Sequence, residues 1–262
     1  WPLGSNTILR MDLYHQYGPL FAELYERIVN FDSLLYSWCT GGGSSFTGNF
    51  LNYLSSPLGI IIMLIMGHEN MPEAIAGMIL VKNAIAAGSF AYFLKKSFNR
   101  NDISITGFGL LYAFCGWFMA YYWNIMWLDG MCILPIVILG IQYIIDGKKK
   151  PYIYCGALCL VMLTSYYMAY MICIIAVVYF IYHYFSKYEF GTINTKLDYE
   201  LRRSEYNRLP FSAKAKLFYK NCLNSKFLTT GINFAFYSIL AFLLAAIALI
   251  PVYFVLKTSS AT

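Results

Sequence analysis

Long apolar stretches separated by short charged clusters dominate the chain. Four windows contain no Asp, Glu, Lys or Arg, namely residues 103–128, 130–145, 151–186 and 227–256. A helix of roughly 20 apolar residues crosses a hydrocarbon core about 30 Å thick, so this pattern predicts transmembrane helices. We expect them at about 75–94, 103–123, 131–146, 152–164, 168–185 and 231–256. The predicted fold class is therefore an all-α polytopic membrane protein.

The opening stretch, residues 6–74, combines a surface helix pattern with turn chemistry. Residues 12–29 predict an amphipathic helix, because Leu13, Tyr17, Leu20, Leu24 and Ile28 recur at helical spacing. The apolar run 57–66 is too short to cross a bilayer. We expect both helices to lie along the outer membrane interface.

Basic clusters predict which side of the membrane each connection faces. Lys95, Lys96 and Arg100, the run 148–150, and the loop 187–230 are rich in Lys and Arg, as cytoplasmic loops are. Residues 6–74 and 257–262 are then extracytoplasmic, and the turn near 124–130 faces the same side. The thirteen-residue segment 152–164 is expected to be tilted or buried by its neighbours.

The first five residues look like the remnant of a protease cleavage site in a recombinant protein. We therefore expect the chain to be a piece of a longer protein, with one helix missing upstream and a further portion downstream.

Composition supports a membrane protein and argues against a nucleic-acid partner. The chain is 59% hydrophobic and 12% charged, a more apolar balance than soluble domains show. Its net charge of +6 is divided among short runs between apolar segments, as expected from membrane topology. Most of the seven cysteines lie in apolar windows without a CxxC spacing, so neither a disulfide framework nor a metal site is predicted.

Three ionisable residues near the predicted outer boundary are candidates for chemistry. Asp129 stands between two apolar segments, where a carboxylate is costly unless it is paired or solvated. Its alternative is a turn aspartate that caps the next helix. Asp12, at the start of residues 12–29, allows the same two interpretations, a functional carboxylate or a helix cap. Lys82 lies roughly 10 Å down its helix and should face inward towards an anion, or else extend to the outer interface.

Histidine and tyrosine side chains give weaker signals. His15 and His68 are too scattered to predict a metal site. Tyr166, Tyr167 and Tyr170 are typical of a membrane-interface core, and stacking on a sugar is the alternative.

Several segments together resemble the YfhO family of bacterial membrane proteins, within the GT-C class of polyprenyl-phosphate-dependent glycosyltransferases. The likeness covers most of residues 8–256. Its most specific pieces are Arg10–Tyr17, Tyr36–Trp38 with Gly41–Ser44, Ser56–Pro57, Lys82, Asn124–Asp129 with Pro135, and Ser165–Met171. The resemblance implies a GT-C-like module whose long first outer loop carries interfacial helices and a catalytic aspartate.

The activity implied by the resemblance is transfer of a sugar at the outer face of the bacterial cytoplasmic membrane. An undecaprenyl-phosphate-type carrier would supply the sugar, and an envelope polymer such as a teichoic or lipoteichoic acid would accept it with inversion. No other cofactor is implied. Asp12 and Asp129 would be catalytic and share one outer cavity. Substrate would be bound by Lys82, Arg10, His15, Gln16, Tyr166 and Tyr167. If acceptor-binding parts lie elsewhere, we expect the fragment itself to be inactive.

A non-enzymatic protein is the main alternative. A transporter of lipid-linked sugars, or a scaffold that binds the carrier, would share the polytopic helices, the buried lysine and the basic loop. It would not need two outer carboxylates.

Overall fold

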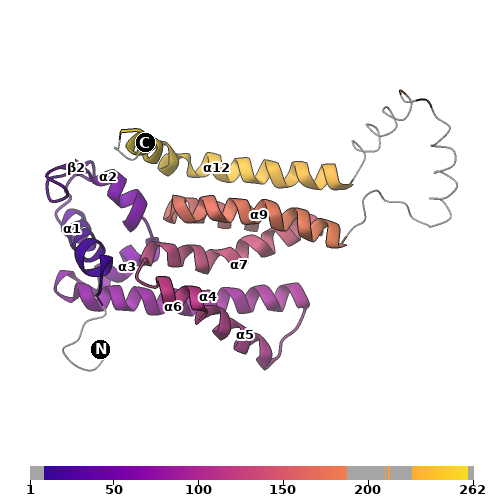
Figure 1. The fold of residues 1–262 in the computed structure, drawn as a ribbon, viewed down its shortest axis with the longest axis horizontal. Helices are drawn as coiled ribbons and strands as arrows, with labels where there is room; N and C mark the ends of the chain where they lie inside the picture. Colours follow the sequence, from indigo (N-terminus) through magenta and orange to yellow (C-terminus); the bar gives the residue numbers. More distant parts are fainter. Residues whose placement is uncertain (1–8, 188–209, 211, 213–225, 259–262) are drawn as a thin grey trace.

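Helices form nearly all regular structure in the computed structural model, which describes residues 9–187, 210, 212 and 226–258 (Figure 1). The helix expected over 12–29 is present as a π-helical turn, η1 (Leu13–Tyr17), continued by α1 (Gly18–Val29). Its predicted apolar face is buried at Leu13, Tyr17, Leu20 and Leu24. The amphipathic pattern is thus confirmed, and this face packs against the protein itself.

A hairpin and a sharp bend complete the first stretch. Strands β1 (Tyr36–Ser37) and β2 (Ser44–Ser45) pair antiparallel. They are followed by α2 (Phe46–Asn49), η2 (Phe50–Leu54) and α3 (Pro57–Met66). The predicted apolar run 57–66 is α3, and it bends by 98° from the α2–η2 segment.

Five helical segments of the described residues are long and apolar enough to cross a membrane. They are η3 (His68–Asn70) with α4 (Met71–Phe98), α5 (Ile103–Ala113) with α6 (Gly116–Tyr121), α7 (Ile125–Ile145), α9 (Tyr166–Lys187) and α12 (Lys226–Thr258). The bent pair α2–η2 and α3 would be a sixth if it were one span. Helix α8 (Tyr152–Thr164) is apolar but shorter. The fold is an all-α polytopic membrane protein, as predicted.

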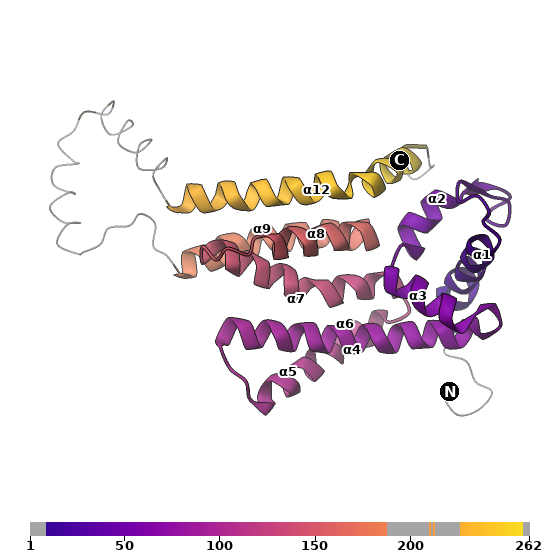
Figure 2. The same ribbon diagram turned by 180° about the vertical axis from the view of Figure 1, so that it is seen from behind.

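The long helices lie side by side, and the short elements gather at one end of the bundle. Figure 1 and the view from behind in Figure 2 show α7 between α4 and the α8–α9 pair, with α12 outside that pair. In α7, 83% of the membrane-length window is buried, against 17% in α5–α6. The core therefore surrounds α7, and the exposed apolar faces of the other helices suit lipid.

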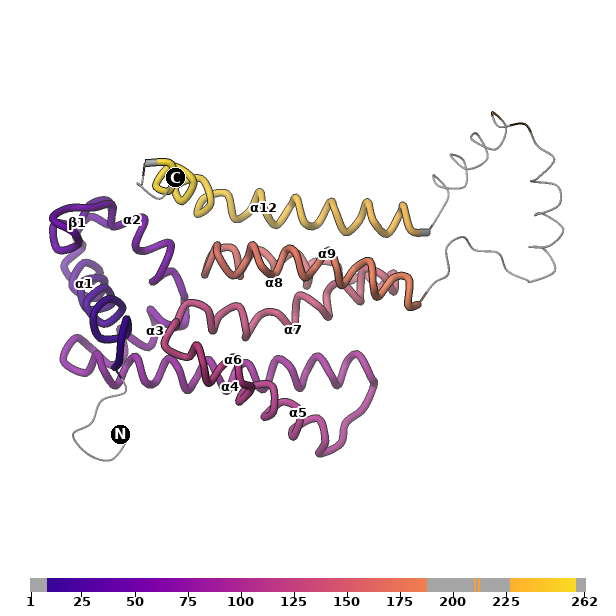
Figure 3. Tube along the Cα trace, viewed as in Figure 1, coloured from indigo at the N-terminus to yellow at the C-terminus, as the bar shows by residue number. Residues whose placement is uncertain are grey.

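Residues distant in sequence meet at the end that carries α1, α2 and α3. The trace in Figure 3 shows the C-terminal part of α12 reaching this end beside α2. Figure 2 shows the last turns of α12 bending, and Pro251, a residue that kinks helices, lies inside this helix. By the predicted topology this is the outer end of the bundle.

Two helices differ from the expectation by more than longer ends. The predicted span 103–123 is broken at Phe114–Cys115, where Cys115 adopts an extended conformation. Helix α7 starts at Ile125 rather than at residue 131, so Asp129 lies inside a helix and not in a turn. Residues 1–5 and most of the predicted basic loop lie outside the described residues.

Candidate functional site

A buried ion pair joins α4 to α7. Lys82 Nζ lies 2.7 Å from Asp129 Oδ2 and donates a second hydrogen bond, of 3.1 Å, to the carbonyl of Ile125. Lys82 is 1% exposed and Asp129 is 7% exposed. Lys82 therefore faces the interior and meets an anion, as expected. The alternative, that its side chain extends to the outer interface, is wrong.

A serine from the opening stretch completes this cluster. Ser56 Oγ donates a 3.0 Å hydrogen bond to Asp129 Oδ1 and accepts one from the backbone of Gly59 as the N-cap of α3. Both carboxylate oxygens of Asp129 thus have protein donors. Asp129 does not cap a helix, because its side chain makes tertiary contacts to two other elements.

The electrostatics of this cluster favour a positioning role. The pair is neutral overall, since the ammonium and the carboxylate balance each other. Removing one partner of such a buried pair leaves an uncompensated charge, a penalty of about 3–5 kcal/mol. Asp129 is already hydrogen-bonded by Lys82 and Ser56, so little of it remains to take a proton from a substrate. The cluster instead fixes the bend at Ser56 against α4 and α7.

A second polar contact ties the opening stretch to the start of α7. The Tyr17 hydroxyl donates a buried 2.9 Å hydrogen bond to Asn124 Oδ1. Burial raises the pKa of Tyr17, and the nearby Asp12 carboxylate raises it further, so the hydroxyl stays protonated at neutral pH.

Asp12 differs from Asp129 in having a partly exposed side chain. It occupies the N-cap position of η1, but its carboxylate accepts no capping hydrogen bond. The simple capping alternative is therefore wrong. Within the described residues Asp12 also takes part in no salt bridge. Its carboxylate thus remains able to act on a molecule at the outer end.

The other predicted site residues are scattered around this end. Arg10 and His15 are exposed, and Gln16 is half-buried. The ring of His15 packs edge-on against Tyr14. Tyr167 stacks on Trp127, with 5.6 Å between ring centroids, so its ring already has an aromatic partner.

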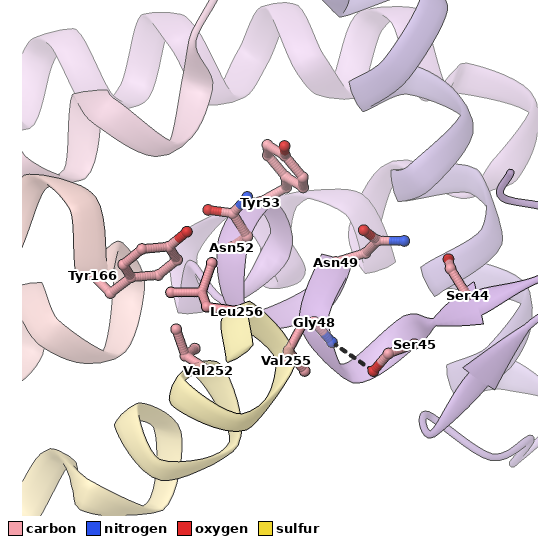
Figure 4. Close-up of a pocket in the computed structure, with 10 residues that line it drawn as sticks. All are labelled: Ser44, Ser45, Gly48, Asn49, Asn52, Tyr53, Tyr166, Val252, Val255 and Leu256. Carbon is pink, nitrogen blue, oxygen red and sulfur yellow. Dashed lines mark hydrogen bonds between the residues drawn. The ribbon is translucent and has the colours of Figure 1, made fainter. Parts of the chain in front are cut away.

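Tyr166 lines a pocket of about 330 Å³ between α2, η2, the start of α9 and the end of α12 (Figure 4). One part of the wall is polar, with Ser44, Ser45, Asn49, Asn52, Tyr53 and Tyr166. The apolar part comes from α12 through Val252, Val255 and Leu256. Neither Asp12 nor Asp129 lines this pocket, so a cavity shared by both carboxylates stays a prediction.

The pocket is nevertheless linked to Asp12 through two aromatic side chains. The Tyr53 ring packs against Tyr17, with 5.6 Å between centroids, and Tyr17 lies within the electrostatic influence of Asp12. Tyr17 and Tyr53 thus join the helix that begins at the partly exposed Asp12 to the pocket wall.

Sequence reasoning missed the contact residues that assemble this end. Ser56, Tyr17 and Asn124 each lie in a segment that the sequence singles out, yet none was predicted to bridge elements. A serine before an apolar helix signals an N-cap. That signal does not reveal that the same hydroxyl also reaches Asp129, 73 positions away.

Comparison with known proteins gives one informative result. Residues 1–262 match the family described as bacterial membrane protein YfhO. No curated protein and no solved structure matches the chain significantly. The family match covers the whole chain and agrees with the helical membrane fold. The chain belongs to the YfhO family of bacterial membrane proteins.

Proposed function

We propose that this protein is a GT-C-type glycosyltransferase that moves a sugar from a polyprenyl-phosphate carrier to an envelope polymer. The observation that carries the proposal is the Asp12 carboxylate, which is partly exposed and accepts no capping hydrogen bond. Its charge acts on Tyr17, a buried tyrosine that donates a hydrogen bond to Asn124 at the start of α7. A pocket with a polar, uncharged wall lies beyond the same tyrosine. Family membership and the membrane fold agree with this activity.

The proposed reaction is a single displacement at the anomeric carbon. An acceptor hydroxyl attacks that carbon while its proton passes to the Asp12 carboxylate. The new bond joins the acceptor oxygen to the sugar, and the bond from the sugar to the phosphate oxygen breaks. The electron pair leaves with the lipid phosphate. One displacement inverts the anomeric configuration, and Asp12 acts as the general base.

The structure changes the role we propose for Lys82. Its ammonium is already balanced by Asp129, so the departing phosphate needs another cation. Arg10 is exposed two positions before Asp12 and is the candidate for that charge. Lys82, Asp129 and Ser56 are then positioning residues that hold the outer elements in place.

Replacing Asp12 with asparagine tests the reaction. Asp12→Asn keeps the side-chain size and removes the base, so the intact, reconstituted protein should transfer a radiolabelled sugar about 10²–10⁴-fold more slowly. Asp32→Asn is the matched control, because Asp32 is an exposed aspartate of the same outer stretch. The control should transfer at the unmodified rate.

The same experiment separates the enzyme from the transporter or scaffold. Binding of the carrier lipid should persist in Asp12→Asn while transfer is lost. Normal transfer by Asp12→Asn would refute the assignment of Asp12. If the unmodified protein binds the carrier but transfers no sugar to any envelope polymer supplied, the result would favour a scaffold that binds the carrier.

A further inference from the structure

We infer that the pocket between α2, η2, α9 and α12 binds an uncharged glycosyl ring. The inference rests on the proposed function, because it names the substrate group that occupies the outer end. Four observations support it: the charge of the wall, its unpaired polar atoms, its apolar side, and its link to Asp12.

The wall favours a neutral ligand. None of the ten described residues that line the pocket is Asp, Glu, Lys, Arg or His. A phosphate or carboxylate group buried there would have no cation to balance it, which is unfavourable. A sugar ring brings several hydroxyl groups without charge, and asparagine and serine side chains can donate to and accept from them.

Two wall atoms lack partners that a hydroxylated ligand could supply. The Ser44 hydroxyl and the Asn49 amide nitrogen are buried, with no hydrogen-bond partner in the described part of the chain. Buried polar groups of this kind are normally satisfied. Figure 4 shows the Asn49 amide turned towards Ser44, while Asn52 and Tyr166 face each other on the other side. Polar groups thus stand on two sides of the space.

The remaining wall suits the carbon skeleton of a ring. Val252 and Val255 of α12 provide aliphatic surface, and Tyr53 and Tyr166 provide aromatic surface. Small-molecule sites typically combine apolar walls with a few placed polar groups. The volume of about 330 Å³ is near the lower end of the usual range, so one ring fits better than a chain of rings.

The end of α12 closes the pocket because Gly48 allows a close approach. A Cβ atom on Gly48 would lie 2.7 Å from Val255 Cγ1, closer than carbon atoms pack. Glycine at this position therefore lets α12 reach α2. A ring held here lies next to Tyr53, and Tyr53 contacts the tyrosine beside Asp12. The glycosyl unit would thus lie two side chains away from the helix that begins at the proposed base.

A binding measurement that needs no transfer tests the inference. The intact protein in nanodiscs is titrated with a short-chain prenyl-phosphoryl hexose and with the same prenyl phosphate without a sugar. The ratio of the two affinities isolates the contribution of the ring. Asn49→Ala and Asn52→Ala should each lower this ratio roughly tenfold, as expected for a lost buried hydrogen bond.

Asn30→Ala is the matched control, since Asn30 is an exposed asparagine of the same outer stretch. It should leave the ratio unchanged. Thermal unfolding of each variant verifies that it is folded. An unchanged ratio in folded Asn49→Ala and Asn52→Ala, together with unchanged binding of a methyl hexoside, would overturn the inference. Equal or tighter binding of a prenyl-phosphoryl hexuronic acid would also overturn it.

A competition arm identifies the source of the ring. If a methyl hexoside displaces the sugar-bearing lipid, the pocket holds the donor sugar. If the methyl hexoside binds without displacing the lipid, and Asn49→Ala weakens that binding, the pocket holds a glycosyl unit of the acceptor. Both results support a glycosyl pocket. Transfer in which Asn49→Ala and Asn52→Ala change neither the ratio nor methyl hexoside binding would refute the pocket alone. A sensitive ratio without any transfer would refute the proposed function alone.

Discussion

Two aspartates that look alike in the sequence have different environments. Asp129 is buried and holds Lys82 and Ser56, whereas Asp12 is partly exposed and caps nothing. We therefore propose Asp12, rather than Asp129, for carboxylate chemistry at the outer end. A buried lysine in a membrane protein suggests a ligand site, yet here another helix of the same protein supplies the anion. A charged side chain deep in a membrane helix indicates that a group of opposite charge lies nearby. The sequence does not identify that group, and the structure does.

The Lys82–Asp129 pair predicts strong coupling between two substitutions. Lys82→Met or Asp129→Asn alone leaves one buried charge unbalanced and should lower the free energy of unfolding by about 3–5 kcal/mol. The double variant removes both charges and should be more stable than either single variant. Thermal unfolding of the unmodified protein, the two single variants and the double variant in one detergent completes a double-mutant cycle, which measures the coupling. Additive losses would show that the pair contributes no coupling.

At the scale of elements, local pattern predicted most helices and missed the contacts between them. The spacing of Leu13, Tyr17, Leu20 and Leu24 was enough to identify the surface helix and its buried face. The start of α7 was misplaced because a lone aspartate between apolar segments reads as a turn. Its real partner, Lys82, is 47 positions away, and no local pattern encodes that distance. The pocket was missed for the same reason, because its walls come from five separate elements.

Close packing of α7 against α8 gives a second stability prediction. A Cβ atom added to Gly140 would lie 2.6 Å from Tyr154 Cα, so the two backbones meet there. Gly140→Ala should force the helices apart and lower the free energy of unfolding by about 1–3 kcal/mol. Gly156→Ala is the control, because a Cβ atom there meets nothing within 4 Å. The control should be neutral or more stable, since alanine favours a helix. Equal loss in both variants would contradict close packing as the cause.

At the scale of the whole molecule, the candidate site depends on elements far apart in the chain. The opening stretch, the start of α7, the start of α9 and the end of α12 all meet at one end of the bundle (Figure 1). Transmembrane helices satisfy their own backbone hydrogen bonds, so specific side chains must join them. The few polar side chains at this end do so, which places structural and proposed functional roles within one small region.

The proposed function also requires this end to face outward, and a native cysteine can report its side. Cys39 is exposed within the opening stretch. An impermeant maleimide should therefore label the protein in intact cells, and Cys39→Ser should abolish that labelling. The exposed Asn101 lies near a basic cluster that is predicted to be cytoplasmic.

Adding Asn101→Cys to a variant that carries Cys39→Ser and Cys222→Ser should restore labelling only after the membrane is permeabilised. The opposite pattern, with residue 101 labelled in intact cells and Cys39 protected, would invert the predicted topology. Asp12 and the pocket would then face the cytoplasm, and transfer to an envelope polymer outside the cell would be ruled out. Sidedness is thus decisive for the proposed reaction, independently of any activity assay.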